Sequence, residues 1–212
     1  MSTTTIGQIT AEQTVYNGND LIEIETAGQT KKEKLSVIYN QAYNDAVAYF
    51  ENNNVTWQYV QNHVILPYSY VVPATRSSAV ELTCLNTSIT TKRANTRIQI
   101  DYMISGEIYW DCSFILYRDI GGVLTEIGSP VSVGNHKYGI ASPDHDPDYD
   151  STMNQNTISY IDSPAAVLGT LITYRLKLYG TANTSYINRT STDTDAAGYE
   201  RGSSNVRLTE IK

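Results

Sequence analysis

Residues 96–104, TRIQIDYMI, alternate polar and apolar side chains, and this alternation decides the fold. Every second residue is apolar, from Ile98 through Ile100 to Tyr102, and the residues between them are polar or charged. Because successive side chains of a strand point to opposite faces, this period of two predicts a β-strand with one buried face. The stretch 170–179, TLITYRLKLY, repeats the pattern. We therefore expect amphipathic strands that pack around a shared core.

Strand patterns of this kind continue over most of the chain. The predicted strands are residues 55–61, 63–72, 79–86, 96–104, 107–118, 122–127, 157–162, 170–179, 184–188 and 204–211. Within 118–127, RDIGGVLTEI predicts a hairpin, because Gly121-Gly122 supplies the positive φ that a tight turn needs. No helical pattern lies between the strands, which excludes a parallel α/β sheet. The sequence predicts a mainly β protein, with a jelly-roll or other β-sandwich head.

The stretch 49–64, YFENNNVTWQYVQNHV, changes from helical to strand spacing at a triple-Asn hinge, residues 52–54. Upstream of the hinge, residues 35–51 place apolar side chains three and four positions apart, which predicts one short amphipathic helix. A helix of this length is not stable alone. Its apolar stripe packs either on the β body or against copies of itself in a three-helix stem, and the sequence leaves both arrangements open.

The residues before the helix predict an extended N-terminal arm. Residues 21–34, LIEIETAGQTKKEK, predict a small hairpin with its turn at Ala27-Gly28. Residues 1–20 are polar and carry too few apolar side chains to become ordered alone. We expect three parts: an attachment arm (1–34), a helical neck and hinge (35–54) and a β-sandwich head (55–212). The candidate anchoring and trimer contacts are apolar residues of the first two parts: Leu21, Ile22, Ile24, Leu35, Ile38, Ala42 and Tyr49.

The composition is that of a β protein with a weakly charged surface. Of 212 residues, 41% are hydrophobic and 17% are charged, and 17 Tyr stand against 2 Phe and 2 Trp. Tyr suits half-buried strands and contact surfaces, because one end of its side chain is apolar and the other can stay wet. The net charge is −7, and the basic residues form no stripe apart from Lys31, Lys32 and Lys34. Nucleic acid is therefore not an expected partner.

Targeting signals and cysteine chemistry are not expected either. The opening MSTTTIGQIT has neither the basic nor the apolar region of a signal peptide, and no apolar run reaches the length of a membrane span. We expect no signal peptide and no membrane insertion. Cys84 and Cys112 lack CxxC spacing, which argues against a metal site. We expect them to be buried free thiols, although the sequence leaves a disulfide between them open.

Residues 144–150, DHDPDYD, carry alternating carboxylates, as in the opening of a calcium loop. An EF-hand would need Gly at its sixth position and Glu at its twelfth, where Tyr149 and Gln155 stand. Two interpretations remain: an irregular cation site, or solvated aspartates that begin turns. The candidate ligands are Asp144, Asp146, Asp148 and Asp150. The whole connection 134–156 is too long for a simple loop, and we expect it to pack on the body or on a neighbour.

The sequence carries no catalytic signature. The three histidines, His63, His136 and His145, form no HxH or HxxxH pair. Glu107 and Asp111 lie four apart on one predicted strand and would face the same side, whereas paired glycosidase carboxylates come from separate elements. A GxSxG elbow and a phosphate-binding loop are also missing. We expect neither an enzyme nor a cofactor.

The C-terminal run 184–212 carries three short motifs around an Asp-containing polar loop, and its last strand is expected to lie inside a sheet and to end on a buried Ile211. The motifs are Tyr186-Ile187-Asn188-Arg189, Arg201-Gly202-Ser203-Ser204 and Leu208-Thr209-Glu210-Ile211. This pattern resembles the C-terminal end of virion structural proteins of tailed bacteriophages, particularly fibre and decoration proteins. The segment 18–40, GNDLIEIETAGQTKKEKLSVIYN, is similar to the segment with which such proteins begin. The resemblance implies a homotrimer with a jelly-roll head like those of tumour necrosis factor and C1q.

These observations predict a homotrimeric structural protein on the surface of a phage particle, assembled in the cytoplasm of the bacterial host. Its arm, residues 1–34, would bind other virion proteins, as in a capsid decoration protein or a short head fibre. The alternative is a receptor-binding tail-fibre or tail-tip protein that recognises a glycan of the host surface. A polysaccharide-degrading enzyme on a β scaffold is a third hypothesis, and it would need two carboxylates that converge in a cleft.

Overall fold

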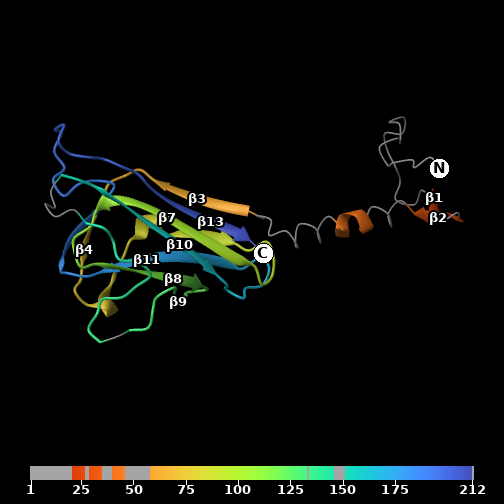
Figure 1. The fold of residues 1–212 in the computed structure, drawn as a ribbon, viewed down its shortest axis with the longest axis horizontal. Helices are drawn as coiled ribbons and strands as arrows, with labels where there is room; N and C mark the ends of the chain where they lie inside the picture. The colour runs from red at the N-terminus through yellow and green to blue at the C-terminus, as the bar shows by residue number, and fades with distance from the viewer. Residues whose placement is uncertain are drawn as a thin grey trace. The chain divides into compact units, whose positions relative to one another are not determined.

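The computed structural model describes residues 21–26, 29–34, 40–45, 58–132, 134–145 and 151–211. The chain divides into two compact units, Met1–Val55 and Thr56–Lys212 (Figure 1). In the described part of the chain, no helix has the length and apolar character needed to cross a membrane.

The N-terminal unit contains the predicted hairpin. Strands β1 (Leu21–Thr26) and β2 (Gln29–Lys34) pair antiparallel, with Leu21 opposite Lys34 and Thr26 opposite Gln29. Further along, residues 40–45 are helical, which confirms a short helix within the predicted range 35–51. The remainder of that range lies outside the described residues.

The second unit is built from strands joined by turns and two short 3-10 helices. Its strands are β3 (Gln58–Val64), β4 (Tyr68–Val72), β5 (Val80–Glu81), β6 (Thr87–Thr90), β7 (Arg97–Glu107), β8 (Ser113–Ile120), β9 (Val123–Ile127), β10 (Asn154–Asp162), β11 (Leu171–Tyr179), β12 (Asn183–Ile187) and β13 (Ser204–Ile211). The 3-10 helices are η2 (Arg76–Ser78) and η3 (Thr83–Leu85).

The strands pair in a nested order. The first strand of the body, β3, pairs with the last, β13, and β4 pairs with β12. Further in, β5 and β6 pair with β11, and β7 pairs with β10. The innermost pair is the β8–β9 hairpin. This is one long antiparallel hairpin rolled up on itself, which is the topology of a jelly roll.

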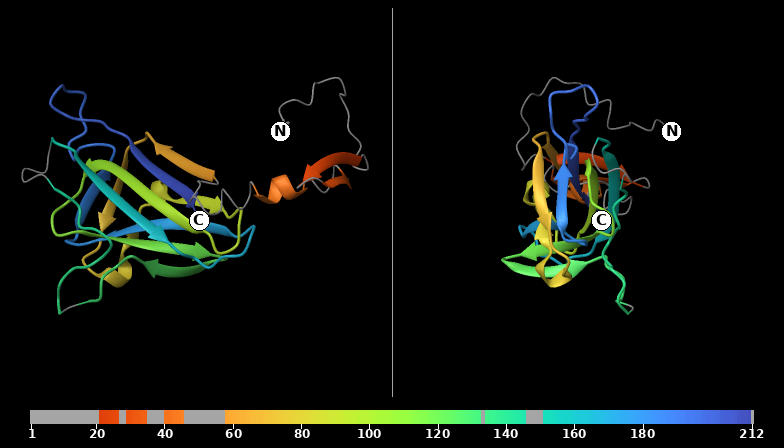
Figure 2. Two further views of the ribbon diagram at one scale, coloured as in Figure 1. Left: turned by 45° about the vertical axis from the view of Figure 1, so that its right-hand side comes forward. Right: turned by 90° about the vertical axis from the view of Figure 1, so that its left-hand side faces the viewer.

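Rolling the hairpin places its strands in two sheets (Figure 2). One sheet, here the β7 sheet, has β10 on one edge of β7 and β13 followed by β12 on the other, with β3 beyond β13 and β4 beyond β12. The other, here the β11 sheet, has β8 and β9 on one side of β11 and β5 and β6 on the other. The two sheets form the predicted β-sandwich.

The core comes from the inward faces of these amphipathic strands. Along β7, buried and partly exposed residues alternate, and Ile98, Ile100 and Tyr102 are buried as their period predicts. Along β11, Ile172, Tyr174 and Leu176 are buried in the same way. One continuous apolar cluster joins the two sheets. Alternation of side chains is thus the property of the sequence that holds the layers together.

Several predicted boundaries are wrong. The predicted strand 63–72 is two strands, because Pro67 lies in the turn between β3 and β4 and cannot donate to a ladder. Residues 108–112 form a turn with Asp111 at φ 55° rather than the beginning of a strand. In the predicted strand 79–86, only Val80–Glu81 is extended, followed by η3. Strand β6 was not predicted, because TSIT is too short to show a period.

The C-terminal strand and the long connection can also be compared with expectation. Strand β13 lies between β3 and β7, inside the sheet as predicted, but Ile211 is only partly buried, because it occupies the end of the sheet. The connection after β9 packs on the body where it is described: Phe114 N donates to Ala141 O and Ile140 N to Phe114 O, both at 2.8 Å. A Cβ atom at Gly139 would lie 1.9 Å from Phe114 O, so only glycine permits this close approach.

Candidate interaction surfaces

The predicted contact residues lie in the part of the chain that is least described. Leu21, Ile22 and Ile24 are on β1, and the structure gives their backbone pairing alone. Ala42 is on the exposed helical segment 40–45. Leu35, Ile38 and Tyr49 are outside the described residues. Their role as anchoring or trimer contacts stays a prediction.

The acidic run is described only at its beginning. Asp144 N donates to Asn156 Oδ1 at 2.6 Å, and its own Oδ1 accepts from His145 N at 3.0 Å. The other candidate ligands, Asp146, Asp148 and Asp150, are outside the described residues. Over the ranges that the structure describes, no three His, Cys, Asp or Glu side chains gather closely enough to hold a metal ion.

The Asn188 motif joins three loops at one end of the β7 sheet. Asn188 is 1% exposed and has a left-handed backbone, with φ 62°. Its Nδ2 donates to Val64 O at 2.8 Å and to Leu66 O at 2.9 Å, which closes the β3–β4 turn. Its Oδ1 accepts from Ser204 Oγ at 2.7 Å, at the start of β13. Asn188, in the Tyr186-Ile187-Asn188-Arg189 motif of the family resemblance, therefore has a structural role: it joins the β3–β4 turn to the beginning of β13.

The polar loop after Asn188 is closed by charge. Asp193 pairs with Arg201 at 2.5 Å and with Arg189 at 3.4 Å, and Arg189 lies 4.7 Å from the centre of the Tyr186 ring. At the base of the loop, the buried Glu107 accepts from Ser191 N at 2.6 Å. Glu107 thus holds the beginning of this loop through its backbone.

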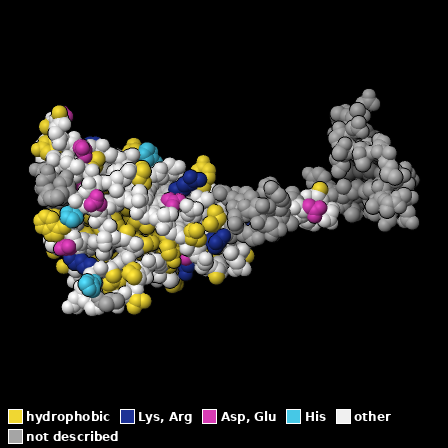
Figure 3. All heavy atoms as spheres, viewed as in Figure 1, with side chains coloured by type: hydrophobic (Ala, Val, Ile, Leu, Met, Phe, Trp, Pro, Cys, Tyr) yellow, Lys and Arg dark blue, Asp and Glu magenta, His cyan; other side chains and the backbone are white. Residues whose placement is uncertain are grey.

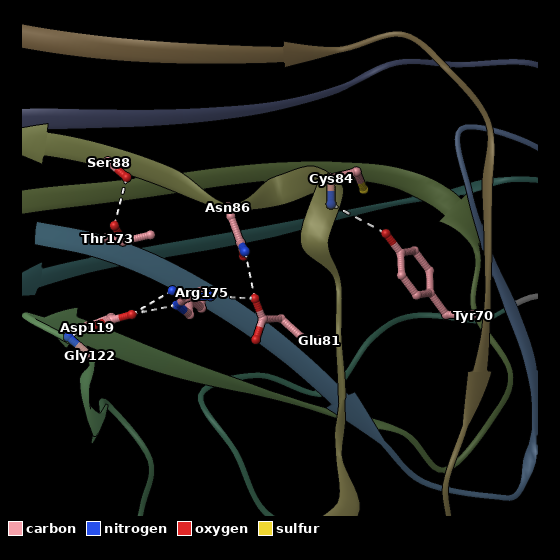
Figure 4. A network of polar contacts seen from close by, with 9 residues as sticks. All are labelled: Tyr70, Glu81, Cys84, Asn86, Ser88, Asp119, Gly122, Thr173 and Arg175. Carbon is pink, nitrogen blue, oxygen red and sulfur yellow. Dashed lines mark hydrogen bonds and ion pairs between the residues drawn. The ribbon is translucent and has the colours of Figure 1, made fainter.

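The outer face of the β11 sheet carries one arginine that is paired with two carboxylates (Figure 4). Arg175 on β11 pairs with Asp119 on β8 at 2.6 Å and with Glu81 on β5 at 3.0 Å. Asn86 Nδ2 donates to Glu81 Oε1 at 2.6 Å. Burial disfavours the charged carboxylate, but these hydrogen bonds and the charge of Arg175 outweigh it and lower the pKa of Glu81. The charged groups of this network are paired with one another, and their contacts join β5, β8 and β11.

A second cluster on the body holds the connection after β9. Arg76 pairs with Glu126 and lies 4.1 Å from the centre of the Tyr138 ring. Tyr138 N donates to Tyr179 Oη at 2.7 Å. Burial would raise the pKa of Glu126, but the hydrogen bond and charge of Arg76 lower it. Arg76 therefore ties η2, β9 and the connection together.

The cysteines are free thiols. Cys112 is buried and Cys84 is partly buried, and neither forms a disulfide. Cys84 N donates to Tyr70 Oη at 3.4 Å, and burial, with the contact to Cys84, raises the pKa of Tyr70 to about 12 (Figure 4). The expectation of free thiols is confirmed, while full burial holds for Cys112 alone.

Four exposed apolar side chains lie near the β8–β9 turn and the beginning of β11. They are Val123, Val167, Leu168 and Leu171, which are 59–69% exposed. Val123 is in register with Ile120 and the buried Ile172, whereas Leu171, the neighbour of Ile172, points to the other face of the sheet. Elsewhere, charged side chains are scattered over the face of the body seen in Figure 3, with no patch of one sign.

The outer face of the β7 sheet contains a shallow hollow with a volume of about 330 Å³. Its side chains come from β7, β10 and β13: Asp101, Met103, Thr157, Ser159, Asn205 and Arg207. Tyr59 on β3, 61% exposed, lies beside it, with the guanidinium of Arg207 5.1 Å from its ring centre. Sequence reasoning missed this surface, because its members come from strands about 100 residues apart and are brought together only by the strand register.

Comparisons with known proteins give only remote likenesses. No family model and no curated protein matches the chain. Among solved structures, the chain is similar to VP2 of infectious bursal disease virus in a subviral particle, with 9% identity and a TM-score of 0.42, over 94% of this chain and 40% of that chain. It is also similar to the structures of the Gx and Gt strains of that virus, with identities of 9% and 11% and TM-scores of 0.33.

These last two likenesses cover 88% and 91% of this chain and 42% and 47% of the others. The chain thus spans less than half the length of each solved chain that it matches. At these low TM-scores, the three likenesses establish neither a family nor a function for the chain.

Proposed function

We propose that this chain is a structural protein of a virus particle: a homotrimer attached through its N-terminal unit, with the jelly roll displayed at the particle surface. The observation that carries the proposal is the nested jelly roll in one compact unit, together with a β1–β2 hairpin in a separate one. Jelly rolls recur in viral capsid proteins, where a rigid sandwich is displayed and its edges are covered by neighbours. The resemblance of the C-terminal motifs to virion proteins of tailed bacteriophages supports the same role.

The surface chemistry favours assembly over catalysis. The ion pairs of the outer β11 sheet are satisfied within the chain, so they stabilise the body and leave no reactive pair. Exposed apolar side chains such as Val123, Val167 and Leu171 are available for contact with a sister subunit. With three subunits, such contacts repeat around one axis and close the assembly.

The presence of the chain in particles tests the virion role. Virus particles that encode the chain should contain it as a stoichiometric component after density-gradient purification and a high-salt wash, when peptides are counted by mass spectrometry. A chain that stays in the soluble fraction of the infected cell and is missing from washed particles would contradict the role.

Cross-linking tests whether the N-terminal units of sister subunits lie together in the proposed trimer. An equal mixture of light and heavy-isotope chains, unfolded and refolded together, is treated with a lysine-reactive cross-linker. We expect mixed-isotope cross-links to concentrate at Lys31, Lys32 and Lys34 on β2, which belong to the predicted arm. Lys177, on the outer face of the β11 sheet, is the control. Mixed cross-links at Lys177 alone would contradict the proposed arrangement.

A further inference from the structure

Two opposite charges face each other across the hollow on the β7 sheet without pairing. Asp101 on β7 lies directly opposite Arg207 on β13 in the strand register. Side chains placed in this way are close neighbours, and opposite charges there normally attract. Here Asp101 accepts instead from Ser159 Oγ at 2.7 Å and from Gln99 Nε2 at 3.1 Å. Arg207 turns toward the Tyr59 ring, and the two residues form no ion pair with each other.

The hollow between these side chains offers unused hydrogen-bonding groups. Arg207 is exposed, and its guanidinium has no hydrogen-bond acceptor among the described side chains. Asp101 keeps acceptor capacity beside its two bonded partners, Ser159 and Gln99, because a carboxylate offers about four acceptor sites. The volume of about 330 Å³ is near the small end of ligand-binding sites.

These groups define the chemistry of a ligand. It must donate to Asp101, accept from Arg207, and carry an apolar surface for Met103. A carboxylate or a phosphate would be repelled by Asp101, and an amine offers no acceptor to Arg207. Neighbouring hydroxyls on a sugar ring both donate and accept, and the C–H face of the ring is apolar.

We infer that this hollow binds a neutral saccharide, with Asp101 and Arg207 holding adjacent hydroxyls and Met103 facing the ring. The inference goes beyond the structural role and does not depend on it, because the site is complete within one chain. A monomer that binds sugar would contradict the trimer and leave this site intact. A trimer that binds no sugar would contradict the saccharide site and leave the proposed trimer intact.

The test is a titration of the full chain with three neutral sugars: methyl α-mannopyranoside, methyl β-galactopyranoside and N-acetylglucosamine. Backbone amide signals are followed by two-dimensional NMR. For at least one sugar, we expect saturable shifts that are largest at Asp101, Asn205 and Arg207. If no amide around the hollow shifts with any of the three, the inference is wrong.

Variants decide whether the shifts report this site. Arg207→Gln and Asp101→Asn should each weaken binding about tenfold, because each removes a charged hydrogen-bonding partner. Lys92→Gln, which removes an exposed positive charge that does not line the hollow, is the matched control and should leave binding unchanged. Arg207 is exposed, so its variant should fold normally, as its melting temperature will show.

Two outcomes would overturn the inference at this stage. The first is binding that survives both variants in folded protein. The second is a set of shifts around the hollow that follows the protein concentration without any sugar, since a second copy of the chain would then occupy the surface.

Discussion

A single asparagine shows how much one side chain can organise in this fold. The backbone at Asn188 is left-handed, a conformation that Asn tolerates better than most residues, and its amide bonds to the β3–β4 turn and to the start of β13. Two carbonyls of the β3–β4 turn, Val64 O and Leu66 O, are thereby satisfied. These hydrogen bonds explain why Asn occupies position 188 in the Tyr186-Ile187-Asn188-Arg189 motif.

Replacing Asn188 with Ala should cost about 2–4 kcal/mol of unfolding free energy, because three side-chain hydrogen bonds are lost and buried groups remain unpaired. The matched control is Asn95→Ala. Asn95 is also left-handed, with φ 56°, but it is exposed and its side chain makes none of these bonds. Urea unfolding of both variants measures the difference. If both variants lose the same unfolding free energy, the left-handed backbone accounts for the cost, and the side-chain hydrogen bonds of Asn188 do not.

At the scale of elements, the sequence predicts the strands whose side chains alternate between polar and apolar. It does not predict a strand such as β6, which is defined by its pairing with a neighbouring strand. The strands β7, β10, β11 and β13 were found by alternation, and the Gly121-Gly122 hairpin by its turn, where φ is 61° and 86°. Strand β6 escaped because four residues show no period, and it is held by its pairing with β11. The break at Pro67 was available in the sequence but was outweighed by the apolar residues on both sides.

Glu210 joins three elements, and its replacement should loosen them together. Its fully buried carboxylate accepts from Lys92 N, Arg93 N and Gln58 Nε2, at distances between 2.6 and 3.1 Å. Glu210→Gln should lower stability by about 1–3 kcal/mol, since the new amide group cannot accept at one of its two positions. Hydrogen exchange should accelerate at Lys92 and Arg93. Glu200→Gln, which alters an exposed acceptor, should change stability by less, and an equal effect would argue against this account.

The pair of Arg76 and Glu126 should make the body sensitive to acid. The folded-state pKa of Glu126 is lowered, so the pair stabilises the fold above the ordinary glutamate value of 4.5, and this contribution is lost as the pH falls through the folded-state pKa. Both side chains are about one quarter exposed, which limits the effect to about 1 kcal/mol or less. In wild-type protein, this contribution to the unfolding free energy is present at neutral pH and lost in acid. Arg76→Gln should remove it at neutral pH, whereas Lys92→Gln should leave it unchanged. Urea unfolding across the pH range measures it, and identical curves for both variants would contradict the role of the pair.

At the scale of the whole molecule, the sequence predicted the class of fold and the presence of an N-terminal hairpin and helix, because both follow from local patterns. It did not predict the hollow, since Asp101 and Arg207 become neighbours only when β7 and β13 pair. The trimer, the attachment of the arm and the virion role stay predictions. They depend on contacts between copies, which the sequence of one chain indicates only through its unpartnered apolar residues.

The most direct test of the central claim is the mass of the purified full chain in solution, measured by light scattering over a range of concentrations. The account predicts a concentration-independent species of three times the chain mass of 23.6 kDa. A species of 23.6 kDa at every concentration would contradict it.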